Sequence, residues 1–431
     1  MQLTKPVDQK ERAQILDILR GFALLGICLA NAGYFSLYIF QKPDGLAALS
    51  TAPVDNWLKW VHYIFIDGKF YSLFSLLFGI GFAIIFFNKT SSGRSRITIF
   101  YRRLFFLMLF GLLHSFLIWD GDILFFYALS GALLPLFRNC SNRTLVALAA
   151  VLIFSPLLFD ILKILTDGKW NISHPFFAIA TAIDKQVGIT EENISTWLIV
   201  HDSYSDLLKW NRSGFWWSWQ MRLDSNRVAK VFAMFLIGLY VGRNRIYERL
   251  QENYSLLKQV QKWGFAVGIP AGFANAYFHF DGKSLPAPAG ILDTLAYALN
   301  VAPLSLAFAA TFCILYCRKE NHSWMQWLQP VGSMALTNYI AQTLFGIGIY
   351  YGIGAGLGSR VGPAVFMPVA VAVFCIQVIY SKYWMKHFNY GPLEWVWRQL
   401  TYGKRLALKR SAISHPLKDP EIKAATKSVD V

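Results

Sequence analysis

The sequence predicts an all-α, polytopic membrane protein with about ten transmembrane helices. Its 431 residues are 55% hydrophobic and 16% aromatic, and their mean hydropathy is +0.38. Only 15% of the residues are charged, well below the quarter that is usual in soluble domains. Apolar runs recur along the chain, most of them near the length that a helix needs to cross the hydrocarbon core. Lysine and arginine concentrate in alternate connections between these runs, which is typical of membrane proteins.

The apolar runs define the predicted spans in chain order. A helical hairpin over 104–137 supplies the third and fourth, because two apolar runs flank a short acidic turn, Trp119-Asp120-Gly121-Asp122. The remaining predicted spans cover 18–40, 70–87, 145–165, 228–241, 264–280, 291–316, 331–353 and 364–380.

The positions of lysine and arginine predict that both termini face the cytoplasm. Of the 41 such residues, 28 fall on the side of the termini and 13 on the other side. This asymmetry explains the net charge of +16, and we expect no nucleic-acid partner. The predicted organisation is an N-terminal five-helix membrane half (1–166), an extracytoplasmic loop with an interfacial aromatic segment (167–227), a C-terminal five-helix membrane half (228–398) and a basic cytoplasmic tail (399–431).

Polar residues in the hairpin mark the first candidate site. A polar or charged group at membrane depth is costly, so His114 and the turn carboxylates are expected to face the protein interior. Asn31 of the first span reaches a similar outer depth at the rise of a helix. We therefore predict that His114, Asp122 and Asn31 line one pocket in the outer half of the membrane. Asp120, closer to water, ranks below Asp122. The alternative is that the three residues only brace the hairpin.

Two other pairs of polar residues are spaced to share a helix face. Asp17 and Arg20 are spaced i, i+3 at the inner end of the first span, where an ion pair is either a structural staple or part of a ligand site. Asn338 and Gln342 lie one turn apart in the ninth span. Interhelical hydrogen bonding is their favoured role, and substrate contact is the alternative.

Tryptophans crowd the end of the extracytoplasmic loop. The favoured interpretation of this segment is an amphipathic helix on the outer membrane surface, because tryptophan prefers the membrane–water boundary. Stacking on a sugar is the alternative. The four tryptophans are Trp210, Trp216, Trp217 and Trp219. The five cysteines imply neither a disulfide framework nor a metal site.

Five stretches resemble a known family of bacterial membrane proteins. They read ILDILRGFALLGICLAN, KFYSLFSLLFGIGF, GLLHSFLIWDGDILFFYAL, GSMALTNYIAQTLF and YGPLEWVWRQLTYG. In this order, over nearly the whole chain, they resemble the YeiB family, whose C-terminal half carries a domain of unknown function. The resemblance implies a multi-pass protein of the bacterial cytoplasmic (inner) membrane, surrounded by membrane lipids.

The YeiB family is in turn similar to transmembrane acyltransferases such as heparan-alpha-glucosaminide N-acetyltransferase. The shared pattern is Asp17, Arg20 and Gly21, followed by Asn31. This similarity implies transfer of an acyl group, foremost acetyl, from cytoplasmic acyl-CoA or acetyl-CoA to an acceptor on the extracytoplasmic side. A sugar is one candidate acceptor. The identity of the acceptor and the assembly, monomer or homodimer, are left open.

The similarity also implies roles for the polar residues. A neutral His114 would take the proton of the acceptor, Asp122 would orient it, and Asn31 would donate to the developing oxyanion. His62, before the second span, is the alternative catalytic histidine. CoA phosphates suit the basic connection that includes Arg94 and Arg96. The expected cofactor-binding residues are Asp17, Arg20, Arg102, Arg103, Asn338 and Gln342.

Two other functional classes remain open. A transporter or lipid flippase would use the same intramembrane polar residues as a route instead of a reaction centre. A structural membrane scaffold is the third class. Binding of CoA would favour the enzyme over both.

Overall fold

The computed structural model describes residues 9–87, 96–280, 290–318 and 324–410. Helices make up 79% of the structure. The described residues contain no β-strand, only an isolated bridge between Phe388 and Lys409. The prediction of an all-α fold is confirmed. All five cysteines are free.

Six segments of the described chain are long and apolar enough to cross a membrane. The first lies within α1 (Gln9–Phe35), and the second combines α3 (Ala52–Phe65) with α4 (Lys69–Phe87). His62 lies in α3, ahead of α4 as predicted, within this same apolar segment. The other four are α5 (Arg96–Leu117), α7 with α8 (Asn142–Phe154 and Pro156–Leu165), α14 (Gly290–Cys317) and α17 (Pro363–His387).

The remaining four predicted spans coincide with shorter or less apolar helices. The fourth predicted span corresponds to the short helix α6 (Leu124–Gly131) and the 3-10 turn η2 (Leu134–Phe137) that follows it. The other three correspond to α12 (Arg227–Arg243, 17 residues), α13 (Tyr254–Phe280) and α16 (Ala335–Tyr350, 16 residues).

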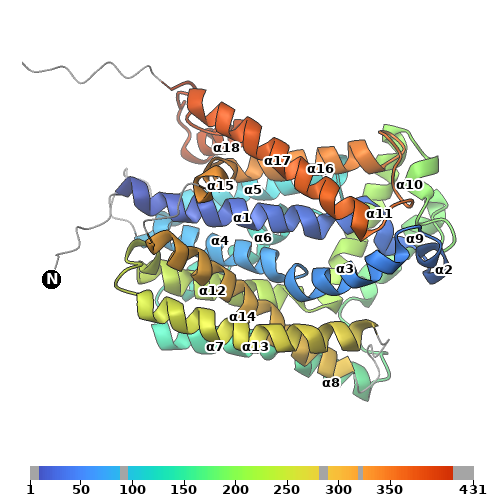
Figure 1. Cartoon of the computed structure of the whole chain (residues 1–431), viewed down its shortest axis with the longest axis horizontal. Coiled ribbons are helices and arrows are strands. Elements are labelled where there is room, and N and C mark those ends of the chain that lie inside the picture. The colour runs from blue at the N-terminus through green and yellow to red at the C-terminus, as the bar shows by residue number, and fades with distance from the viewer. Residues whose placement is uncertain (1–8, 88–95, 281–289, 319–323, 411–431) are drawn as a thin grey trace, which may run out of the picture.

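The long helices run side by side along the long axis of the molecule, and short helices gather at its two ends (Figure 1). One end carries the start of α1 and the C-terminal helix α18 (Pro392–Tyr402). The opposite end carries α2 (Pro43–Ala47), α9 (His174–Val187), α10 (Trp197–Val200) and α11 (Tyr204–Asp224).

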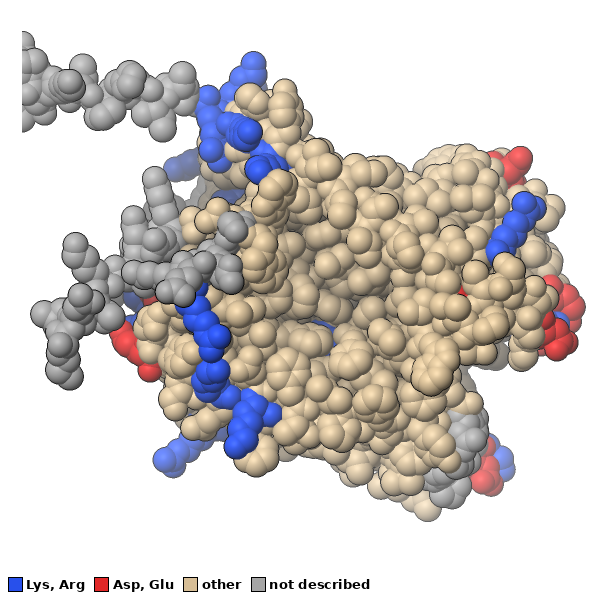
Figure 2. Space-filling model, in the orientation of Figure 1, with Lys and Arg blue, Asp and Glu red and all other residues tan. Residues whose placement is uncertain are grey.

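Charged side chains are distributed unevenly along this axis. Figure 2 shows Lys and Arg concentrated at the end that carries α18 and the start of α1, whereas the middle of the visible face is almost free of charged residues. Acidic residues appear mainly at the opposite end. An uncharged middle between two charged ends is the distribution that a bilayer demands of the surface it contacts.

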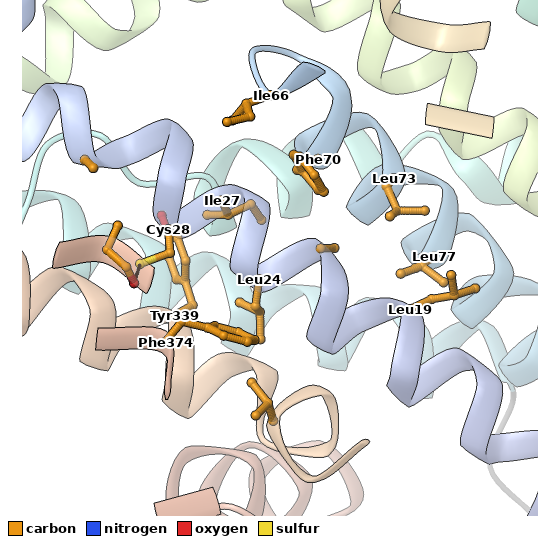
Figure 3. Packing of buried hydrophobic residues seen from close by; sticks show 14 of the residues in the cluster. Leu19, Leu24, Ile27, Cys28, Ile66, Phe70, Leu73, Leu77, Tyr339 and Phe374 are labelled. Carbon is orange, nitrogen blue, oxygen red and sulfur yellow. Dashed lines mark hydrogen bonds between the residues drawn. The ribbon is translucent and has the colours of Figure 1, made fainter. Parts of the chain in front are cut away.

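The helix α1 packs against partners on several sides. In Figure 3, Leu24 lies toward Tyr339 of α16 and Phe374 of α17, while Leu19 lies toward Leu77 of α4. All five residues belong to one buried hydrophobic cluster. Polar residues carried by α1 are therefore held in fixed positions relative to α4, α16 and α17.

Two glycines allow α1 to approach α15 (Leu328–Ser333) closely. A Cβ added to Gly21 would lie 2.2 Å from the carbonyl oxygen of Leu328, and one added to Gly332 would lie 1.8 Å from that of Asp17. Only glycine permits such backbone contact between helices. The stretches DILRG and GSMAL, far apart in the sequence, thus meet at one helix crossing.

A similar glycine contact joins α4 to α12. A Cβ on Gly79 would lie 2.2 Å from the carbonyl oxygen of Phe235. We expect Gly79→Val to separate the two helices and to lower stability by at least about 1–3 kcal/mol, measured as a lower thermal unfolding temperature in detergent. Gly81→Val is the matched control on the same helix, because no described atom lies within 4 Å of a Cβ at Gly81. Equal stability of the two variants would show that the crossing tolerates a larger residue.

Candidate functional site

The hairpin turn brings His114 and Asp122 into direct contact. His114 Nδ1 lies 2.8 Å from Asp122 Oδ2, and His114 Nε2 lies 3.1 Å from Thr343 Oγ1 of α16. The exposed fractions are 2% for His114, 1% for Asp122 and 1% for Thr343. Since an ionised carboxylate only accepts, Nδ1 carries the proton that binds Asp122. In the neutral ring Nε2 then keeps its lone pair and accepts from the Thr343 hydroxyl.

Several groups fix Asp122 in this position. Its Oδ1 accepts a hydrogen bond from the Phe125 main-chain N–H at 2.8 Å, in the first turn of α6. Its main-chain oxygen accepts from the guanidinium of Arg222. The next residue, Ile123, donates its N–H to Tyr339 Oη at 3.2 Å. The carboxylate is therefore held by the hairpin, by α11 and by α16 at once.

A cavity of about 340 Å³ adjoins this pair at the extracytoplasmic end predicted for the molecule. Its walls come from parts of the chain that are distant in sequence. The end of α1 contributes Asn31 and Tyr34, the hairpin turn contributes 119–121, α11 contributes most of the remainder, and Arg227 comes from the start of α12. This volume is in the range of small-molecule sites.

Asn31 lines this cavity, but His114 and Asp122 do not. The two residues lie behind the wall instead. Trp119 lines the cavity and also packs against the imidazole, with ring centroids 6.3 Å apart. The expected common pocket is thus divided into a buried His114–Asp122 pair and an adjoining cavity that contains Asn31.

Asp120, ranked below Asp122 from the sequence, is the turn carboxylate that lines the cavity. It has no cation within ion-pair distance among the described residues. Burial raises the pKa of Asp120 from 3.8 to about 6, although the Arg222 charge and a hydrogen bond from Trp210 act in the opposite direction. Its carboxylate lies against α11, where a Cβ on Gly214 would be 2.2 Å from Oδ2.

The aromatic segment of the long loop forms part of the cavity wall. Trp210 is 7% exposed and lines the cavity, as does Trp217. The Trp217 indole N–H donates to Asp184 Oδ2 at 2.7 Å, and the Ser213 hydroxyl donates to the other oxygen of that carboxylate. These rings therefore face inward, the orientation that the stacking interpretation requires. Membrane-surface contact by the rest of the segment stays a prediction.

The inner end of α1 carries the predicted ion pair. Arg20 Nη1 lies 2.5 Å from Asp17 Oδ1, and Ser333 Oγ donates to Asp17 Oδ2 at 2.9 Å. Arg103 stacks on Trp397 of α18 with its guanidinium carbon 4.1 Å from the ring centroid, while Arg102 lies 5.9 Å from the Phe106 ring. Arg94 lies outside the described residues. A role for these cations in binding CoA stays a prediction.

Asn338 and Gln342 belong to a buried network between helices. Asn338 Nδ2 donates to Ser381 Oγ at 3.1 Å, and its main-chain oxygen accepts from Gln377 Nε2 at 2.8 Å. Gln342 Nε2 donates to Gln377 Oε1 at 2.9 Å and to the Leu24 oxygen at 3.1 Å. These contacts match the favoured interhelical role. Contact with a cofactor stays a prediction.

Sequence reasoning did not single out two polar residues. Thr343 directly follows Gln342, but no local pattern shows that it meets His114 of another helix. Glu394, in the stretch YGPLEW, receives hydrogen bonds from the N–H groups of Leu336 and Thr337 at 2.6 and 3.0 Å. A carboxylate at a helix N-terminus satisfies free N–H groups and favours the helix dipole. Glu394 therefore fixes the start of α16, the helix that carries Thr343.

The second half of the chain matches a known protein family. The sequence profile of a protein family of unknown function (DUF418) matches residues 241–404. The chain is also 31% identical over 424 residues to the uncharacterized protein YxaH of Bacillus subtilis (strain 168). The aligned region covers 93% of this chain and 97% of YxaH. The chain belongs to the YeiB-like family of DUF418 proteins.

Other members of the YeiB-like family match over similar lengths. The uncharacterized protein YeiB of Escherichia coli (strain K12) is 26% identical over 417 residues, with 91% of this chain and 96% of YeiB covered. An uncharacterized 39.9 kDa protein of Bacillus acidopullulyticus is 29% identical over 422 residues, with 94% of this chain and 99% of that protein covered. No solved structure matches the chain.

Proposed function

We propose that this YeiB-like protein is an acyltransferase of the bacterial cytoplasmic membrane. It takes an acyl group, of which acetyl is the simplest case, from acyl-CoA on the cytoplasmic side. It transfers this group to a hydroxyl or amine of an acceptor bound in the cavity beside the hairpin turn. The observation that carries the proposal is the buried His114–Asp122 hydrogen bond next to that cavity, because it fixes the ring tautomer of a general base.

The proposed topology has ten spans with both termini in the cytoplasm. Two findings support it. The start of α1 and α18 lie at the same end of the molecule (Figure 1), and Lys and Arg gather there (Figure 2). The positive-inside rule assigns such an end to the cytoplasm. The cavity and its cover of α9, α10 and α11 then face the extracytoplasmic side.

The proposed reaction is attack of the acceptor oxygen or nitrogen on the thioester carbonyl. The new acyl–acceptor bond forms and the carbon–sulfur bond breaks, so that CoA leaves as a thiol. His114 takes the acceptor proton at Nε2, once the Thr343 hydroxyl that binds this nitrogen has released it, and returns the proton to the leaving sulfur, while Asp122 stabilises the charged ring. Asn31 offers an amide donor to the oxyanion from the cavity wall. Displacement of Trp119, the residue between imidazole and cavity, brings the base to the acceptor.

The test is transfer of radiolabel from acetyl-CoA into acceptors of native membrane vesicles that contain the overproduced protein. The proposal predicts incorporation that depends on His114. The control for folding is that the purified protein, with and without the His114 substitution, is stabilised against thermal unfolding by CoA. The competing transporter hypothesis predicts movement of a solute with no covalent label. Label that appears equally without the protein would contradict the enzyme proposal.

A further inference from the structure

Two arginine side chains line the cavity near the junction of α11 and α12. Arg222 is 7% exposed and donates to Ser218 Oγ at 2.9 Å as well as to the main-chain oxygen of Asp122. Arg227 lies over the Tyr71 ring, 5.0 Å from its centroid. In the described part of the chain neither guanidinium has a carboxylate within ion-pair distance. A buried cation with no carboxylate in direct contact is costly, which makes an anion a favourable ligand.

The carboxylates of the cavity do not neutralise these arginines by contact. Asp184 is bound by Trp217 and Ser213. Asp120 has no described cation within ion-pair distance; Trp210 donates a hydrogen bond to it, and a carboxylate has further lone pairs that can accept from a ligand. Guanidinium and carboxylate groups without an ion-pair partner among the described residues therefore line the same cavity, and a ligand that carries both an anionic group and a hydroxyl satisfies the two together.

The remaining walls suit the apolar faces of such a ligand. Trp210, Trp217 and Tyr34 line the cavity and present aromatic surface. Aromatic rings pack well on the C–H faces of polyols and also remain compatible with polar neighbours. A cavity of about 340 Å³ has room for a small headgroup but not for a long acyl chain beside it.

We infer that this cavity binds an anionic, hydroxyl-bearing group of the phosphate-ester class, with the phosphate on Arg227 and Arg222 and a hydroxyl on Asp120. The role of this group as the acyl acceptor rests on the proposed function. Its binding in the cavity does not depend on that reaction. The same chemistry occurs in soluble phosphate esters and in anionic lipid headgroups, and the experiment distinguishes these two sources.

The experiment measures binding to the full-length protein in phosphatidylcholine nanodiscs. One arm titrates sn-glycerol 3-phosphate against glycerol by calorimetry, and the other replaces phosphatidylcholine by phosphatidylglycerol and records thermal unfolding. We expect the anionic probe to bind or stabilise in at least one arm, and Arg227→Gln to weaken that effect about tenfold or more. A response to the soluble probe identifies a phosphate ester, and a response only to phosphatidylglycerol identifies a lipid headgroup.

Two variants make the result specific. Lys209→Gln removes an exposed cation of α11 that pairs with Asp206 outside the cavity, and it should leave binding unchanged. Arg227→Lys keeps the charge and should retain salt-sensitive binding, which separates loss of charge from loss of fold. Equal responses to neutral and anionic probes in both arms would overturn the inference. Anion binding that persists in a protein without acyl transfer would instead refute only the proposed reaction.

Discussion

Replacement of His114 by glutamine is expected to lower the rate of acyl transfer by about 10²–10⁴-fold, the usual contribution of a general acid–base residue. Glutamine keeps an amide that can donate to Asp122, but it has no nitrogen lone pair to accept the acceptor proton. The protein should still insert, purify and bind CoA. The measurements are initial rates with labelled acetyl-CoA and the thermal unfolding temperature of the same preparation.

His114→Ala provides a comparison for this variant, because it also leaves the buried Asp122 carboxylate without its partner. Breaking a buried pair in this way costs about 3–5 kcal/mol, so alanine should lower stability more than glutamine does. If His114 only braces the hairpin, activity will follow stability across the two variants. A glutamine variant with normal activity would therefore exclude His114 as the base.

The second large effect is expected for Asp122→Asn. The amide has nearly the same shape as the carboxylate, but it does not stabilise a protonated imidazole and it permits the other ring tautomer. The equivalent change in a serine-protease triad lowers kcat about 10⁴-fold, and we expect a loss of about 10²–10⁴-fold here. The variant should bind CoA normally. Kinetics with separate kcat and KM values provide the measurement.

Asp120→Asn is the matched control, since it changes the same turn by the same atoms. Asp120 lines the cavity whereas Asp122 contacts the imidazole. The Asp120 variant should therefore raise KM for the acceptor more than it lowers kcat. Equal losses of kcat in both variants would contradict the separate roles assigned to these carboxylates.

The hairpin and the His114–Asp122 contact were predictable because they depend on local spacing. Two apolar runs around a short acidic turn specify antiparallel helices, and residues near that turn then lie close together. The ion pair of Asp17 with Arg20 follows equally from i, i+3 spacing on one helix. In these cases the interacting groups belong to one helix or one turn, so no knowledge of the tertiary packing was required.

The cavity was not predictable in the same way. Depth along the membrane normal was the only argument for grouping Asn31 with His114, and depth does not determine the direction in which a side chain points. The turn orients Asp120 and Asp122 differently although they are only two residues apart. Arg222 and Arg227 come from the long loop and its end, a region whose packing against the hairpin leaves no periodic pattern in the sequence.

Thr343 and Glu394 illustrate a further limit. Thr343 meets His114 across 229 residues of sequence, and Glu394 binds the start of α16 from a separate helix. A polar residue in an apolar helix indicates that it faces a partner, but the partner is defined only by the packing of helices. The close glycine contacts of Gly21 and Gly332 set that packing for α1 and α15.

The central claim is acyl transfer from the cytoplasmic to the extracytoplasmic side, and one measurement tests it most directly. Labelled acetyl-CoA is supplied to inverted and to right-side-out native membrane vesicles that contain either the wild-type protein or His114→Gln. We predict covalent label in membrane acceptors of inverted wild-type vesicles, where the cytoplasmic face is accessible, and background label in the other three samples. Equal label in inverted vesicles with and without His114, at equal protein levels, would contradict the account.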